Sequence, residues 1–485
     1  MPMDNFVLYN GGYRVLNGYV PFNDYWLVTG PLLDYLNAFF FFINGTNWKS
    51  FIIHSSLFNS IISIVTYFIF ICLKLPKKYA ITYSIFFSIL FYPVVGTPFV
   101  DHHSTFFLIL AFYFFIFGLN KNENLYFVFI PFLFVLAFLS KQTPAVYGLF
   151  GILILFTIFI FFDFKKNIKI LIPLVVGSII SVSFFILFIF FTKINFINFL
   201  EQYILYAKTI GDFRFATYKF DFFGTVAEYK FILILLIFLS ITLIRLLKEN
   251  NAETIFSILT IIVLSCLLIF HQYYSLNQNY IFFLIPLIAG TIHTFYKKSF
   301  TNNYILPFII LVCVYSTVKY HLRFNEHRKF NELEKVDISK AIDAEILTQD
   351  LKGLKWITYY HPNNPEYEIN NLREAMDILS KEKSKKMIIT DYQFIAAALN
   401  IYDFSPNQWH HPSVSFPVKN QKYFNEYKSF FIKNLKKNSI DFIYETSETE
   451  DSIVEKVISK NCVSKERMSK MLVKFMLNKN CKDFK

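Results

Sequence analysis

The chain has 485 residues, of which 55% are hydrophobic, 20% aromatic and 17% charged, with a formal net charge of +12. A soluble domain carries roughly 25% charged residues, so this composition excludes a wholly soluble enzyme, a collagen, a disordered chain and a small disulfide-rich protein. Residues 321–485 hold 27 Lys or Arg and 23 Asp or Glu, whereas residues 1–320 hold only 20 and 12. Because +8 of the net charge lies in this apolar part, it does not indicate a nucleic acid as partner.

Residues 1–50 precede the first long apolar run and are predicted to form an outer loop with interfacial helices. Asp4 begins a short amphipathic helix, and residues 21–26 form a turn. Residues 32–43 are apolar but too few to cross a bilayer, so we expect them to lie in the interface. The first long apolar run starts only at Phe51, and no cleavable signal peptide is visible.

Ten apolar runs follow, each close to the roughly 20 residues that a helix needs to cross a bilayer. They are residues 51–73, 79–96, 104–119, 124–140, 145–162, 170–192, 229–244, 254–270, 279–295 and 303–319. Helices are expected there, because an unpaired backbone group in hydrocarbon costs several kcal/mol. The sequence therefore predicts a polytopic α-helical membrane protein with about ten transmembrane helices over residues 51–320.

The basic residues predict the orientation of this bundle. Connections on one side hold 11 Lys or Arg in 32 residues, and those on the other side hold 7 in 105. By the positive-inside rule the first side is cytoplasmic, and an even number of spans then places residues 1–50 and 321–485 outside. The outer side also holds eight of the twelve acidic residues of the membrane part, which suggests a site there: Asp4, Asp24, Asp34, Asp101, Glu201, Asp212, Asp221 and Glu228.

The charged tail, residues 321–485, predicts a soluble extracytoplasmic α/β domain. Strands are expected at 355–360, 386–390 and 440–444, and amphipathic helices at 368–382 and 422–437. Cys462 and Cys481 both lie in this tail, and an outer location permits a disulfide between them. Residues 409–412, Trp-His-His-Pro, are interpreted as a turn, with a loop that stacks on a sugar as the alternative.

Several motifs follow one another in the predicted outer loops. After Asp4 come residues 16–18 (Leu-Asn-Gly), 21–24 (Pro-Phe-Asn-Asp), 30–32 (Gly-Pro-Leu), 100–103 (Val-Asp-His-His) and 137–144 (Ala-Phe-Leu-Ser-Lys-Gln-Thr-Pro). In this order they resemble the C-type (GT-C) glycosyltransferases, and most of all the branch with protein O-mannosyltransferases and the aminoarabinose transferase of lipid A. The resemblance extends over about residues 4–320 and implies a GT-C-like bundle.

The resemblance implies transfer of a sugar from a polyprenyl-phosphate donor to an envelope glycan, lipid or protein. The reaction takes place at the outer face of a bacterial inner membrane, usually with inversion. Asp4 matches the acidic position of the general base, which accepts the proton of the attacking hydroxyl. Asp101 matches the second acidic position, as partner of the base, acceptor ligand or metal ligand. Its alternative role is to cap the helix that begins near Ser104.

Lys141 is the first candidate for binding the donor phosphate, because it is basic on the side where basic residues are rare. Snorkelling to the interface is the alternative. Arg214 offers the bidentate geometry that suits phosphate. Asp24, His102 and His103 are interpreted as supporting the acceptor or the site, with Asp24 bracing its own turn.

The sequence leaves open whether the protein binds a metal ion. His102 and His103 beside Asp101 suggest zinc, but adjacent residues rarely bind one ion together. Some members of the resembled family need a divalent cation and others do not. The sequence therefore predicts no certain cofactor.

Two features depart from the family pattern. Its members usually carry a transmembrane helix before the first acidic residue, so a helix encoded upstream of Met1 is one expectation. Many also carry Arg-Tyr where this chain has Asn279-Tyr280. Two other functions stay open: a non-catalytic or transport-type protein of envelope glycan export or assembly, which needs a polar cavity through the bilayer, and a receptor with a cleft in residues 321–485.

Overall fold

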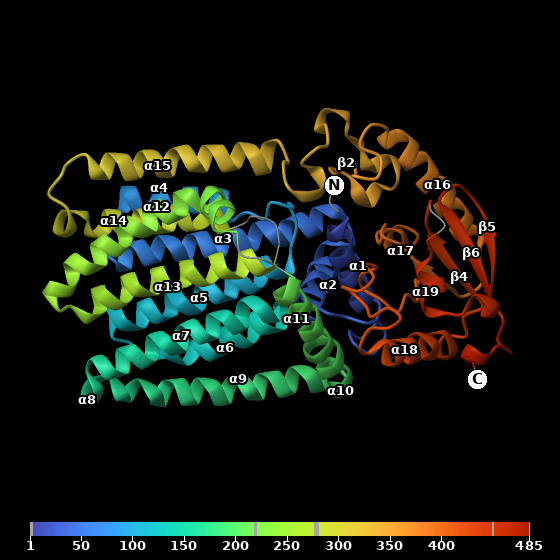
Figure 1. Ribbon diagram of the computed structural model, residues 1–485, viewed down its shortest axis with the longest axis horizontal. Coiled ribbons are helices and arrows are strands. Elements are labelled where there is room, and N and C mark those ends of the chain that lie inside the picture. Colours follow the sequence, from blue (N-terminus) through green and yellow to red (C-terminus); the bar gives the residue numbers. More distant parts are fainter. Residues whose placement is uncertain (1–2, 218–220, 276–280, 449–450, 485) are drawn as a thin grey trace. The chain divides into compact units, whose positions relative to one another are not determined.

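The computed structural model describes residues 3–217, 221–275, 281–448 and 451–484 (Figure 1). They form two compact units. The first comprises Met1–His54, Ile189–Ala216 and Glu332–Lys485, and the second comprises Ser55–Phe188 and Thr217–Asn331. Residues 189–216, predicted to be part of the membrane domain, therefore belong to the same unit as the N-terminal loop and the tail.

All ten predicted apolar runs form helices. They are α3 (Trp48–Cys72), α4 (Lys77–Phe91), α5 (Val100–Lys121), α6 (Leu125–Ser140), α7 (Gln142–Phe162), α9 (Leu171–Phe191), α12 (Phe222–Leu246), α13 (Ala252–Ser275), α14 (Leu284–Ser299) and α15 (Ile305–Tyr320). The short helix α8 (Phe164–Asn167) precedes α9. The prediction of a polytopic helical chain is confirmed.

Seven helical segments of the described chain are long and apolar enough to cross a membrane: Trp48–Cys72, Val100–Lys121, Gln142–Phe162, Phe164–Phe191, Phe222–Glu249, Ala252–Ser275 and Ile305–Glu326. The other three predicted spans, α4, α6 and α14, have 15, 16 and 16 residues. At about 1.5 Å per residue such helices are shorter than the roughly 30 Å hydrocarbon core. For α6 the short length has a local cause, because the helix ends at Ser140, just before Lys141 adopts an extended backbone.

Helix α5 forms the interior of the second unit. Within an apolar stretch of 18 residues in this helix, 94% of the residues are buried. In the corresponding stretch of the segment that contains α9, only 11% are buried. α6, α7 and α13 pack around α5, and glycines permit their close approach. A Cβ on Gly148 of α7 would overlap Leu108 of α5, and a Cβ on Gly118 of α5 would lie 2.5 Å from Phe127 of α6. The first turn of α5 is thereby held inside the bundle.

The first unit joins segments that are far apart in the sequence. Its helices before the tail are α1 (Asp4–Leu16), α2 (Leu32–Asn44), α10 (Phe196–Phe199), a π-helical stretch over Leu200–Tyr206, and α11 (Ala207–Thr217). Trp26 and Tyr206 lie in one hydrophobic core with the tail residues Met387, Phe431 and Phe475. The N-terminal loop and the segment after α9 are therefore built into the tail domain.

The tail contains a four-stranded sheet in the order β3-β4-β6-β5. The strands are β3 (Lys386–Ile389), β4 (Phe442–Thr446), β5 (Val463–Arg467) and β6 (Leu472–Leu477). β3 and β4 are parallel, with Lys386 opposite Phe442, and the other two pairs are antiparallel. The tail helices are α16 (Pro365–Lys381), α17 (Ile395–Ala398), α18 (Phe424–Lys437) and α19 (Ile453–Val457).

The α/β character of the tail is as predicted, but its strands differ in detail. The predicted strand at 355–360 is reduced to β2 (Lys355–Trp356), which pairs with β1 (Ile342–Asp343) outside the main sheet. β5 and β6 were not predicted, and β5 is an exposed edge strand with few apolar residues. A disulfide joins Cys462 and Cys481, whose Cα atoms lie 5.3 Å apart.

Candidate functional site

Asp101, Lys141 and His271 form a buried ionic cluster in the second unit. The Lys141 ammonium lies 2.6 Å from Oδ2 of Asp101, and Nε2 of His271 lies 3.2 Å from Oδ1. The Asp101 side chain is fully buried and that of Lys141 is 19% exposed. Since a buried charge is costly unless it is paired, the ammonium and the imidazole hold this carboxylate in place.

The ends of three helices bring these groups together. Asp101 lies in the first turn of α5, where the helix dipole favours a negative charge. Lys141 is the extended residue between α6 and α7, and its carbonyl accepts a hydrogen bond of 3.1 Å from the hydroxyl of Ser104. His271 lies in the last turns of α13. All three ends belong to the side that the basic residues predict to face outside.

His271 was missed by the sequence reasoning. It follows the apolar run 254–270 and stands in a polar stretch with Gln272, on the predicted outer side. That position is the signal that could have revealed it. A histidine at a span end is ambiguous without a partner, and the partner Asp101 is 170 residues away in the sequence.

His102 and His103 hydrogen bond to the backbone. Nε2 of His102 lies 2.8 Å from the carbonyl oxygen of Phe91, and Nδ1 of His103 lies 3.2 Å from that of Phe99. The first contact joins α5 to the last residue of α4, and the second is local, to the residue directly before α5. Within the described ranges, no group of three His, Cys, Asp or Glu side chains could hold a metal ion.

Asp4 belongs to the first unit, at the first residue of α1, where the helix dipole favours its charge. Burial raises the pKa of the Tyr359 hydroxyl, and the charges of Glu332, Asp391 and Asp4 add to this rise. Asp4 therefore lies within electrostatic range of the tail. That Asp4 and Asp101 act on one substrate stays a prediction, since the two belong to different units.

Asp24 and Arg214 also belong to the first unit. Asp24 accepts the backbone N–H of Val20 at 2.8 Å and pairs with the Lys437 ammonium at 2.6 Å. These two contacts brace the turn of Asp24 and tie that turn to α18. Arg214 lies on α11, a helix without a buried residue, and in a different unit from Lys141.

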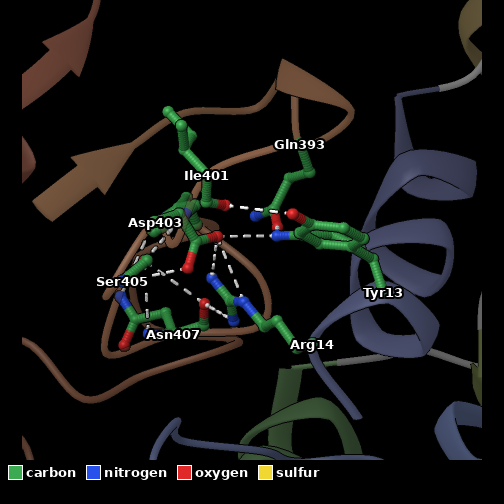
Figure 2. Close-up of polar contacts among 9 residues, drawn as sticks. Tyr13, Arg14, Gln393, Ile401, Asp403, Ser405 and Asn407 are labelled. Atoms are coloured by element: carbon green, nitrogen blue, oxygen red, sulfur yellow. Dashed lines mark hydrogen bonds and ion pairs between the residues drawn. The ribbon is translucent and has the colours of Figure 1, made fainter. Parts of the chain in front are cut away.

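A second polar network, shown in Figure 2, fixes α1 on the tail within the first unit. The Arg14 guanidinium donates to Oδ2 of Asp403 from Nε at 3.1 Å and from Nη2 at 2.6 Å, and to the carbonyl of Asn407 at 2.8 Å. Asn10 donates to the same Asp403 oxygen at 2.8 Å and to Gln393 at 3.0 Å. Arg14 and Asp403 are almost completely buried, so this pair is structural and unsuited to binding a substrate.

Asp34 of α2 is a further buried carboxylate of the first unit. The Tyr25 hydroxyl donates to it at 2.7 Å, and Gln408 Nε2 lies 2.7 and 2.9 Å from its two oxygens. Burial raises the pKa of Asp34 to about 7, while the Tyr25 and Gln408 hydrogen bonds and the charge of Arg14 act in the opposite direction. A carboxyl group with this pKa titrates near neutral pH.

The tail contains a cavity of about 300 Å³ at the carboxyl ends of the parallel strands β3 and β4. Ligands of α/β sheets bind at such ends. Polar pairs line it: the Tyr360 hydroxyl donates to Asp391 at 2.8 Å, and His361 lies 3.1 Å from Glu448. Nearby, residues 409–412 were predicted to form a turn, but the turn lies at residues 413–415, between the bridged Pro412 and Phe416. Burial lowers the pKa of His410 to about 3, so this histidine is neutral, and its Nε2 lies 3.2 Å from the Ser405 hydroxyl.

Neither a family model nor a curated protein matches the chain. The chain is similar to an oligosaccharyltransferase. This solved structure, from Archaeoglobus fulgidus, is a complex with zinc and sulfate, and the match has 13% identity and a TM-score of 0.38. It covers 91% of this chain and 64% of that protein, so the chain spans less than two thirds of its length. At this TM-score no site residue can be transferred, and the function has to be argued from the residues of this chain.

Proposed function

We propose that the chain is a membrane glycosyltransferase that moves a sugar from a polyprenyl-phosphate donor to an envelope glycan, lipid or protein. The observation that carries the proposal is the Asp101–Lys141–His271 cluster, where the ends of α5, α7 and α13 meet. It combines a carboxylate, a cation and an imidazole inside a helical membrane bundle. These are the group types that a glycosyl transfer needs.

In this mechanism an acceptor hydroxyl attacks C1 of the sugar as its proton passes to a carboxylate, Asp4 or Asp101. Inversion follows when the base acts on the face opposite the leaving group. The bond between C1 and the phosphate oxygen breaks with its electron pair, so the lipid phosphate gains negative charge. Lys141, partly exposed beside Asp101, neutralises this charge. Arg214 is the second candidate cation, and Asp24 acts only through the position of the N-terminal loop.

The location follows from the distribution of charge. The predicted outer side carries the cluster, residues 1–50 and the tail, and the arrangement fits the outer face of a bacterial inner membrane. The cluster at these helix ends can then reach both the lipid-linked donor and the bilayer. The use of a divalent cation, which the family resemblance leaves open, is tested by adding a chelator to the assay.

The test is sugar transfer from labelled polyprenyl-phosphate donors to a membrane extract by the purified full chain. We expect Asp101→Asn and Asp4→Asn each to lower turnover about 10²-fold or more, because general base catalysis contributes about 10²–10⁴-fold. Asp212→Asn is the matched control, since Asp212 is exposed on the predicted outer side. Unchanged turnover in both variants would refute the assignment of these carboxylates.

One observation favours a second function. The tail cavity has about the smallest volume usual for a small-molecule site, about 300 Å³. A receptor or a non-catalytic subunit of glycan export or assembly would use it without transferring a sugar. Sugar binding by the full chain in the absence of any transfer, with every donor tried, would favour this alternative.

A further inference from the structure

Helix α18 has one face in the core of the tail domain and an opposite face rich in lysine. Tyr427, Phe431 and Leu435 are buried in the hydrophobic core. The residues of the opposite face lie three or four positions apart along the helix. They border an open hollow of about 660 Å³, and its lining consists of Asn425, Lys428, Ser429, Ile432, Lys433, Lys436 and Lys437. Four ammonium groups, an amide and a hydroxyl therefore border one hollow.

Hydrogen bonds connect this face to the end of a membrane span. The span Phe164–Phe191 is followed by Lys193 and Asn195. Asn23 donates to the carbonyl of Lys193 at 2.8 Å and accepts from the N–H of Asn195 at 2.9 Å. The next residue, Asp24, pairs with Lys437 at 2.6 Å. Lys437 is thus separated from the end of the span by two side chains, and all these residues belong to the first unit.

The end of this span and the segment after it expose large apolar side chains. The exposed fraction is 73% for Phe191 and 72% for Ile197, which is typical of residues in contact with lipid. Trp26 connects this segment to α18, since its ring centroid lies 5.8 Å from those of both Tyr206 and Phe430. The segment with these exposed apolar side chains is therefore linked to α18 through Trp26 and through the pair of Asp24 and Lys437.

We propose that the lysine face of α18 binds the phosphate groups of anionic phospholipids in the surrounding bilayer. Lysine is a compact cation that binds phosphate as a point charge, and the side chains of Asn425 and Ser429 supply neutral donors beside it. The source is the bilayer, because side chains tie this face to the end of a span whose neighbouring residues expose large apolar side chains. This binding does not depend on sugar transfer.

The experiment measures lipid binding to the full chain in detergent by native mass spectrometry. The probes are phosphatidylglycerol, which is anionic, and phosphatidylcholine, which is not. Since a basic residue near an anionic membrane surface is worth about fivefold in binding, we expect Lys433→Gln with Lys436→Gln to weaken phosphatidylglycerol binding at least tenfold. The same variant should leave phosphatidylcholine binding unchanged.

The matched control is Lys383→Gln with Lys385→Gln, which removes two exposed charges elsewhere in the same unit. We expect the control, and Lys433→Arg with Lys436→Arg, to bind phosphatidylglycerol like the unchanged chain. Equal weakening by the control, or equal binding of both lipids by the unchanged chain, would overturn the proposal. Full competition by inorganic phosphate at the concentration of the lipid would also overturn it, because the site would then be one for free anions.

Discussion

The close approach of α1 and α2 depends on one residue, Gly11. A Cβ at this position would overlap the Asp34 carboxylate and lie 2.7 Å from Nε2 of Gln408. Both groups are buried and bonded to each other, so neither can move without leaving a polar atom unpaired. The glycine is therefore required by space, since its backbone is ordinary helix.

We predict that Gly11→Ala lowers the stability of the first unit by about 1–3 kcal/mol, the usual cost of overpacking a buried site. The measurement is the thermal unfolding midpoint of the purified chain. Gly211→Ala is the control, because nothing lies within 4 Å of a Cβ there and alanine is favoured over glycine in a helix. An equal midpoint for Gly11→Ala and the unchanged chain would contradict the packing described.

The buried Asp34 predicts a pH dependence of stability. Its pKa is raised from 3.8 to about 7 in the folded chain, so the folded state holds the proton more tightly than the unfolded state. The sign follows: this contribution is fully present below pH 4, and it is lost as the pH rises towards 7. At about 1.4 kcal/mol per pKa unit, the loss amounts to roughly 4 kcal/mol at most.

The comparison with Asp34→Asn isolates this effect, since the other titrating groups are common to both chains. We expect the midpoint of the unchanged chain, relative to that of the variant, to fall between about pH 4 and pH 7. Thermal unfolding in detergent at several pH values measures it. A constant difference over this range would show that Asp34 does not titrate there.

At the scale of elements, the disulfide ties the start of β5 to the segment after β6. Cys462 is buried in the tail core, and Cys481 packs against that core. Closing a loop over a sequence separation of 19 restricts the unfolded chain and stabilises by about 3 kcal/mol. We therefore expect Cys462→Ser with Cys481→Ser to lower the tail's resistance to urea by about this amount. Tryptic cleavage within residues 463–485, measured against urea concentration, reports it.

The sequence predicts long elements better than short ones, for a physical reason. All ten apolar helices were predictable, because burial in lipid requires a continuous apolar stretch. The edge strand β5 was not, because only Val463 of its five residues is apolar, and its conformation comes from pairing with β6. Likewise, the predicted strand at 355–360 loses its pairing after Trp356, since its only partner, β1, has two residues.

At the scale of the molecule, the candidate site was predictable in part. Asp101 and Lys141 both came from the motifs, and the structure joins them by an ion pair. His271 was missed, because its role appears only when α13 packs beside α5. Arg14 was likewise overlooked, although it joins α1 to the tail through a buried ion pair with Asp403. Contacts over hundreds of residues have no local signal in a sequence.

The same link constrains the number of membrane crossings. Arg14 contacts Asp403, and the backbone N–H of Leu27 donates to Gln202 at 3.0 Å. Residues 1–47, 192–216 and 332–485 all belong to this unit, so we predict that they lie on one side of the membrane. This prediction requires an even number of crossings between residues 217 and 331. Among the described helices of that stretch, α12, α13 and α15 belong to the seven long segments, so we expect the 16-residue helix α14 to cross as well.

We predict that the connection after α14 is cytoplasmic and the tail extracytoplasmic. Lys297 and Lys298 lie at the cytoplasmic end that the positive-inside rule assigns. Alkaline phosphatase, which needs the disulfides that form outside the cytoplasm, should be inactive when fused after residue 301 and active after Lys485. Fusion after residue 122 is the internal control, also expected to be inactive. Activity after residue 301 without activity after Lys485 would mean that α14 does not cross, and the shared side of the three segments would then be wrong.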